Sequence, residues 1–116
     1  MSNEMRNISF DASDVLSLDG VMLPLEFALG QNYPNPFNPS TKIQYTLAKD
    51  GFVSVDIYDL MGRNIKSLIN TGQVAGYYEI HWNATNNNGE VVPAGMYFYM
   101  IRAGEFTSTK KMVLLK

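Results

Sequence analysis

A proline-rich segment in the first half of the chain restricts the fold more than any other part of the sequence. Residues 31–40 read Gln-Asn-Tyr-Pro-Asn-Pro-Phe-Asn-Pro-Ser, and they hold three of the five prolines, Pro34, Pro36 and Pro39. Proline fixes its own φ, lacks an N–H group and disfavours helical geometry in the residue before it. The segment therefore cannot form a helix, and it cannot lie in the middle of a sheet.

The same segment carries the large aromatic residues Tyr33 and Phe37, together with asparagines whose side chains can bond to nearby backbone groups. We expect an ordered, extended strap, residues 32–39, whose two aromatic side chains pack onto a folded body. The alternative is a flexible linker, although linkers rarely carry bulky aromatic residues among their prolines.

The overall composition excludes several classes of protein. The 116 residues fit one domain with a modest core, and 46% hydrophobic with 17% charged residues is typical of a globular chain. A net charge of −2 offers no basic surface for nucleic acid, and no apolar run approaches the roughly 20 residues of a membrane span. Residues 1–14 do not resemble a signal peptide, so an exported parent would contribute this chain from its interior or C-terminal part. The lack of cysteine excludes disulfides and thiolate chemistry.

Beyond the strap, apolar and polar residues alternate with the period of a β-strand, and no stretch shows a helical period. We expect seven strands, at residues 41–47, 53–57, 63–69, 77–82, 90–92, 96–103 and 106–115. Short strands at this spacing predict an all-β sandwich, with Trp82 between the two sheets. Residues 1–23 are interpreted as a linker or the remnant of an upstream domain, and residues 24–116 as the sandwich domain.

Several short motifs occur in one order along the chain. They are the strap, Ile-Tyr-Asp-x-x-Gly-Arg at 57–63, Trp-Asn at 82–83, Asn-Gly at 88–89, Pro-Ala-Gly-Met-Tyr at 93–97 and Lys-Lys-Met-Val-Leu-Leu-Lys at 110–116. In this combination, residues 24–116 resemble the type IX secretion C-terminal sorting domain, which is similar to the immunoglobulin-like domain of the flagellar hook-capping protein. The resemblance implies a seven-stranded, antiparallel, immunoglobulin-like sandwich.

The resemblance also implies a function in export without catalysis. Domains of this family direct a periplasmic cargo protein through the outer-membrane translocon to the cell surface or the medium, and a sorting peptidase often removes them. The implied partners are the translocon, the peptidase and an upstream cargo domain of the same native chain, and strand edges could support a weak homodimer. The residues expected to be recognised by the translocon are Lys110, Lys111, Met112, Val113, Leu114, Leu115 and Lys116. The expected structural motif consists of Asn32, Tyr33, Pro34, Asn35, Pro36, Phe37, Asn38, Pro39, Tyr58, Asp59, Gly62, Arg63, Trp82, Gly95 and Tyr97.

No set of side chains in the sequence has the pattern of a catalytic site. The carboxylates of the strand region are spread over turns and outward positions, and the single histidine, His81, lacks the partners that a triad or a metal site needs. We therefore expect neither an enzyme nor a cofactor. The asparagine-rich loop at residues 83–89 predicts a turn, with calcium binding as the alternative, since strong calcium sites depend on carboxylates.

Three alternatives remain open. Met96, Phe98 and Met100 alternate with Tyr97, Tyr99 and Ile101, so one of the two sets must lie on the face away from the core. That set is either covered by the strap or the N-terminal segment, or exposed to a partner. The last strand is either an ordinary edge protected by its lysines or an edge that a translocon component binds, for example by strand addition. The rival functions are an adhesive or structural immunoglobulin-like module, and a carbohydrate-binding module whose stacking platforms are Tyr77, Trp82 or Tyr99.

Overall fold

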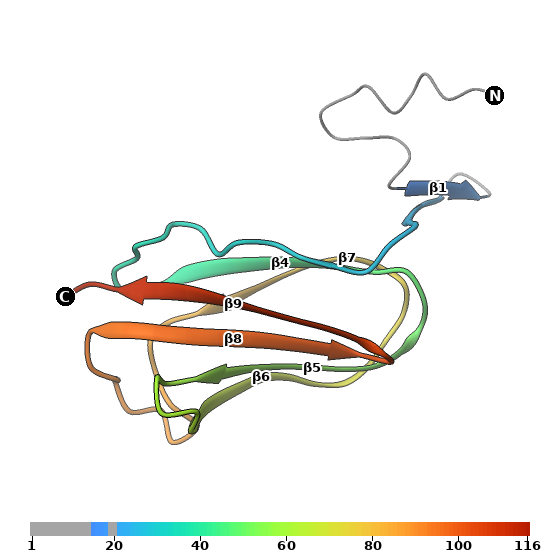
Figure 1. Ribbon diagram of the computed structural model, residues 1–116. Helices are drawn as coiled ribbons and strands as arrows, with labels where there is room; N and C mark the ends of the chain where they lie inside the picture. Colours follow the sequence, from blue (N-terminus) through green and yellow to red (C-terminus); the bar gives the residue numbers. More distant parts are fainter. Residues whose placement is uncertain (1–14, 19–20) are drawn as a thin grey trace.

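The described part of the chain consists of β-strands joined by turns and loops. The computed structural model describes residues 15–18 and 21–116, and these residues contain no helix, hence none long and apolar enough to cross a membrane. The strands, most of which are labelled in Figure 1, are β1 (Val15–Leu18), β2 (Val21–Pro24), β3 (Ala28–Leu29), β4 (Thr41–Leu47), β5 (Gly51–Tyr58), β6 (Asn64–Gln73), β7 (Gly76–Trp82), β8 (Gly95–Ala103) and β9 (Phe106–Leu114). They pair as a β1–β2 hairpin, a three-stranded sheet β3–β4–β7 and a four-stranded sheet β6–β5–β8–β9, all antiparallel.

The two larger sheets pack face to face, and the predicted alternation identifies their inner faces correctly. Along β4, β5 and β8, every second side chain is buried between the sheets. Trp82, at the end of β7, is buried as expected, and its ring lies 5.8 Å from that of Phe37 and 5.4 Å from that of Tyr97. Burial of a large apolar side chain stabilises a fold by about 1.5–3 kcal/mol. The side chains that alternate into the core therefore supply much of the free energy that stabilises the sandwich.

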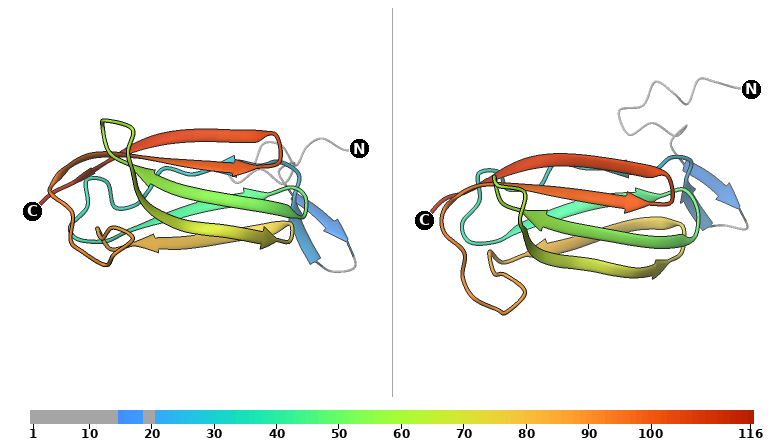
Figure 2. Two further views of the ribbon diagram at one scale, coloured as in Figure 1. Left: turned by 90° about the horizontal axis from the view of Figure 1, so that it is seen from below. Right: turned by 60° about the horizontal axis from the view of Figure 1, so that its bottom comes forward.

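The chain enters and leaves the sandwich at opposite ends. Figure 1 shows the β1–β2 hairpin beyond one end and the C-terminus at the other. The end that holds the C-terminus also holds the turn between β5 and β6, the loop between β7 and β8 and the first residues of β8, as the rotated views in Figure 2 confirm. An upstream domain would therefore join the sandwich far from its last residue.

Three strand predictions need correction. The expected strand at residues 90–92 is a single bridge between Thr85 and Val91, because the loop closes on itself through a 2.9 Å bond from Val92 N to Ala84 O. The third strand extends to residue 73 rather than 69, since its second half pairs with the start of β5. Three short elements, β1, β2 and β3, were not expected, because none of them shows a sustained alternation.

Candidate recognition site: the strap and the last strand

The strap joins the edges of the two sheets through its backbone. On one side, Tyr33 exchanges two 2.9 Å backbone hydrogen bonds with Lys42 of β4. On the other side, Phe37 N donates to Val113 O, and Leu115 N donates to Phe37 O, again at 2.9 Å. Because Lys42 belongs to the three-stranded sheet and Val113 to the four-stranded sheet, the strap closes one side of the sandwich.

Two side chains extend this contact along the outer edge of β9. The Asn35 Oδ1 atom accepts a 3.0 Å hydrogen bond from Val113 N, and Gln31 Nε2 donates a 2.9 Å bond to Lys111 O. With the two bonds of Phe37, these contacts occupy the outward backbone groups from Lys111 O to Leu115 N. The expectation that a partner could add a strand to this part of the edge is therefore wrong, because the strap already occupies it.

A buried network fixes the start of the strap. The Tyr99 hydroxyl donates to Gly30 O and accepts from Asn32 N, both at 2.7 Å. The Asn32 amide donates to Thr41 Oγ1 at 3.0 Å and to Pro34 O at 3.2 Å, and Thr41 Oγ1 donates to Pro34 O at 2.8 Å. Leaving a buried polar group without its partner costs about 1–3 kcal/mol, so each of these side chains supports the others.

This network predicts sensitivity to alkaline pH. Burial raises the pKa of Tyr99 to about 12, whereas an exposed phenol titrates near pH 10. The contribution of the protonated Tyr99 hydroxyl to the stability of the fold is therefore fully present below pH 10, and it is lost as the pH rises toward 12. We expect the melting temperature to fall steeply across this interval, as measured by circular dichroism. The variant Tyr99→Phe should melt lower at neutral pH but depend less on pH above 10, and an unchanged pH dependence would contradict the assignment.

The two aromatic residues of the strap differ in their environment. Phe37 is 1% exposed and packs on Trp82, as expected, whereas Tyr33 is 73% exposed, so its predicted packing is wrong. The register explains the difference. Tyr33 is paired with Lys42, and directly paired residues project on the same face, which for Lys42 is the solvent face.

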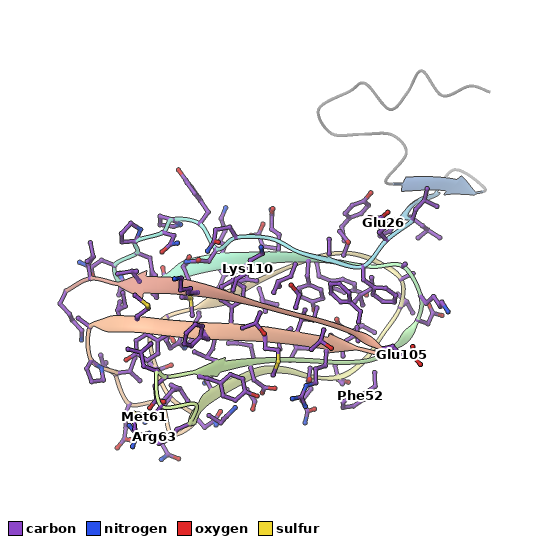
Figure 3. The ribbon with its side chains drawn as sticks, viewed as in Figure 1. Glu26, Phe52, Met61, Arg63, Glu105 and Lys110 are labelled. Atoms are coloured by element: carbon purple, nitrogen blue, oxygen red, sulfur yellow. The ribbon has the colours of Figure 1, made fainter. Side chains whose placement is uncertain are left out.

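The residues expected to be recognised by the translocon do not form one surface. Met112 and Leu114 are buried in the core, while Lys111 and Val113 lie on the outer face of β9. Leu115 and Lys116 follow the strand and are exposed. Lys110 occupies an inward-facing register position, yet its side chain is half-exposed at the margin of the sheet, where Figure 3 labels it. Side-chain alternation along β9 thus divides this motif into core and surface residues.

The Tyr-Asp-x-x-Gly-Arg motif builds the turn between β5 and β6. Asp59 Oδ1 accepts 2.9 Å hydrogen bonds from Met61 N and Arg63 N, and Asp59 Oδ2 accepts a 2.8 Å bond from Arg63 Nε. The Arg63 backbone N–H and then its side chain hold the pKa of Asp59 below its ordinary value. Gly62 has a φ of +84°, which an L-residue adopts only with strain. The residues of this motif therefore close and stabilise the turn between β5 and β6.

The loop after β7 is closed by its own asparagines. The Asn86 Oδ1 atom accepts bonds from Asn88 N at 2.9 Å and Glu90 N at 3.0 Å, while Asn86 Nδ2 donates to Glu90 Oε1 at 2.9 Å. This confirms the predicted turn. Within residues 15–18 and 21–116, no three acidic or histidine side chains gather as metal ligands would.

Two of the three aromatic residues considered as carbohydrate platforms are unsuitable for that function. Trp82 and Tyr99 are almost fully buried, whereas Tyr77 is partly exposed. His81 lies on the surface, as expected, with its Nε2 atom 3.2 Å from Glu79 Oε2. The aromatic residues therefore do not form a flat exposed row.

The outer face of the four-stranded sheet is apolar near the C-terminal end. Met96 is 39% exposed, and Phe98 and Met100 are partly exposed. Figure 1 looks onto this face, and none of the described segments crosses it. The expectation that the strap covers these side chains is therefore wrong, because the strap runs along the edge of β9 instead. Sequence alternation placed the three residues on one face. The alternative that the N-terminal segment covers them falls largely on residues outside the described part of the chain.

The fold and the strap define a small β-sandwich module built around its last strand. The sequence matches the family model described as "Secretion system C-terminal sorting domain" over residues 31–115. The chain belongs to this family, and it is a C-terminal sorting signal of type IX secretion. No curated protein matches the sequence.

Solved structures with the same fold include components of this secretion system. The chain is similar to latent PorU from Porphyromonas gingivalis, with 23% identity and a TM-score of 0.60, covering 84% of this chain and 10% of PorU. It is also similar to PorZ, described as an essential surface component of the type IX secretion system of that bacterium, with 22% identity and a TM-score of 0.52 over 78% of this chain and 11% of PorZ. FlgD from Xanthomonas campestris gives 23% identity and a TM-score of 0.53 over 75% of this chain and 65% of FlgD. The chain thus spans about a tenth of PorU and PorZ, and these likenesses concern the fold.

Proposed function

We propose that this domain folds in the periplasm and carries an upstream cargo protein through the outer-membrane translocon to the cell surface or the medium, without catalysing a reaction. The match of residues 31–115 to the sorting-domain family is the observation that carries this proposal. The sandwich acts as a folded signal: the strap fixes the last strand in place, and the translocon and the sorting peptidase are the partners.

The finer fold is proposed to be immunoglobulin-like. If the seven strands of the sandwich are numbered from β3, the first, second and fifth form one sheet, and the fourth, third, sixth and seventh form the other. An immunoglobulin constant domain divides its seven strands in the same way except for the fourth, which it places in the other sheet. Only one edge strand therefore distinguishes the two arrangements.

The positions of the two chain ends support this function. The hairpin that precedes the sandwich lies at the end opposite Lys116, as Figure 1 shows. A cargo domain attached before β1 would leave the outward side chains of β9 accessible. The strap holds that strand against β8, so its surface would be presented in one fixed conformation.

A reporter fusion tests the proposal. A periplasmic reporter fused to residues 1–116 is produced in a host with an active type IX system, and the reporter is assayed in the periplasm, on the cell surface and in the medium. We expect it to leave the cell, and to remain in the periplasm when the tail is omitted or the host translocon is inactivated. Retention of the intact fusion in the active host would contradict the proposed function.

A further inference from the structure

We propose that the translocon binds the outer face of β8 and β9 beside the C-terminus, rather than the edge of the last strand. This inference rests on the proposed function and identifies the surface through which it operates. The partner is a protein surface with an apolar centre and carboxylates at its rim. The new partner-binding residues are Met96, Phe98 and Met100, together with Tyr58 beside them and Lys111 and Val113 of β9.

The first step is that the backbone of the last strand is already occupied. From Lys111 onward, β9 bonds to β8 on one side and to the strap on the other. Strand addition requires free N–H and C=O groups. A partner that recognises this part of the chain must therefore contact side chains on a face, and the inner face is buried in the core.

The second step is the composition of the outer face. Phe98 lies directly between Tyr58 of β5 and Lys111 of β9 in the strand register. Met96 is directly opposite Val113. Cross-strand neighbours have Cβ atoms about 5 Å apart, so these five side chains form one continuous patch that combines aromatic, methionine and lysine groups. Aromatic residues and methionine are enriched in protein interfaces.

The third step is the contrast with the other outer face. On the three-stranded sheet, two of the three outward pairs of β4 and β7 are wholly polar, Lys42 with His81 and Gln44 with Glu79, and the third joins Thr46 to Tyr77. Gln44 Nε2 donates to Glu79 Oε1 at 3.3 Å. A sheet face that meets only water is expected to be polar, as most of this one is. The apolar part of the four-stranded sheet around Phe98 departs from that pattern, and an exposed apolar patch is typical of a surface that binds a partner.

The fourth step is charge. Residues 106–116 contain three cations, Lys110, Lys111 and Lys116, and no carboxylate side chain, whereas the whole chain has nine cations and eleven carboxylates. Glu105 lies in the turn at the far end of the sheet, where Figure 3 labels it. Asp59 and Glu90 lie in loops at the C-terminal end, and Asp56 is directly opposite Met100, so the cationic element is β9 itself. A carboxylate of the partner beside Lys111 would orient the complex and accelerate its formation.

Two pairs of matched substitutions test this inference in the reporter fusion. Phe98→Ser is compared with Phe52→Ser, an exposed phenylalanine at the opposite end of the same sheet, and Lys111→Glu is compared with Lys42→Glu on the polar sheet. We expect Phe98→Ser and Lys111→Glu each to lower the exported fraction about tenfold, which corresponds to a loss of 1.4 kcal/mol of binding free energy. We expect the exported fraction of each control variant to stay within about twofold of that of the unsubstituted fusion.

Thermal melting of each purified 116-residue variant shows whether it folds. If Phe98→Ser does not fold, Met96→Ser takes its place.

The outcomes separate the two proposals. Export of folded Phe98→Ser and Lys111→Glu at the level of the unsubstituted fusion would overturn the inference while leaving the proposed function intact. Failure of the unsubstituted fusion itself would overturn the proposed function. Sedimentation that shows a dimer, together with a monomeric Phe98→Ser variant that is exported normally, would assign the face to self-association and also overturn the inference.

Discussion

Replacement of Phe37 by alanine is expected to lower the free energy of unfolding by about 3–5 kcal/mol. The side chain is 1% exposed and its ring contacts Trp82, so its removal leaves a cavity between the strap and the core. The loss is a large part of the 5–15 kcal/mol that stabilises a typical domain. Urea denaturation followed by Trp82 fluorescence measures it directly, since Trp82 is the single tryptophan.

Tyr33→Ala is the matched control for that prediction. Tyr33 lies in the same strap between similar residues, but its side chain is exposed and its backbone bonds to Lys42 remain in the alanine variant. We expect a change below about 0.5 kcal/mol, as for most surface substitutions. Equal losses in the two variants would contradict the structural distinction between a buried and an exposed aromatic residue.

Removal of residues 111–116 is expected to abolish cooperative folding. The deletion eliminates Met112 and Leu114, which are fully buried, and loss of each side chain alone costs about 2–5 kcal/mol. It also removes the backbone partners of Phe37 at Val113 and Leu115. We expect the truncated chain to show no sharp thermal transition by calorimetry, and therefore to fail in export through misfolding.

The shorter deletion of Leu115 and Lys116 separates these effects. Both residues are exposed, and the fold loses only the hydrogen bond from Leu115 N to Phe37 O, worth about 0.5–1.5 kcal/mol. We expect this chain to melt within several degrees of the full domain. A cooperative transition in the longer deletion, at a similar temperature, would show that Met112 and Leu114 are not core residues.

The sequence predicted those elements in which one face is buried. In β4, β5, β7 and β8, an apolar side chain recurs at every second position because it packs against the opposite sheet, so the pattern itself reports the fold. The strap was predicted from a different constraint, since Pro34, Pro36 and Pro39 exclude regular structure while Phe37 requires burial. The buried strands and the strap could both be predicted because each follows from the chemical properties of individual residues, which can be read directly from the sequence.

Features that depend on pairing between distant backbones could not be predicted in this way. The short strand β3 exists because Ala28 and Leu29 pair with Thr46 and Tyr45, and two residues carry no alternation. The exposure of Tyr33 follows from its register with Lys42, which composition does not reveal. The occupied edge of β9 arises from contacts between residues about 80 positions apart, such as Asn35 and Val113.

Both edge strands of the four-stranded sheet are covered over part of their length by irregular segments. The strap covers the C-terminal part of β9, and at the opposite edge Asn87 N donates to Ile65 O while Ser67 N donates to Asn87 Oδ1, both at 3.0 Å. Exposed edges invite pairing with other chains, so such coverage protects a protein that must pass through a translocon without aggregating. In the proposed complex, this coverage also directs recognition toward the side chains of the outer face.

Amide hydrogen exchange at Val113 and Leu115 tests most directly whether the strap holds the last strand. The N–H groups of these residues point away from β8 and bond to Asn35 Oδ1 and Phe37 O. We predict that Val113 is protected nearly as strongly as the core of β8, and that Leu115 is protected clearly, if less, because it lies next to the last residue. Exchange of both amides at the rate of an unstructured peptide, in a domain whose β8 amides are protected, would contradict the account.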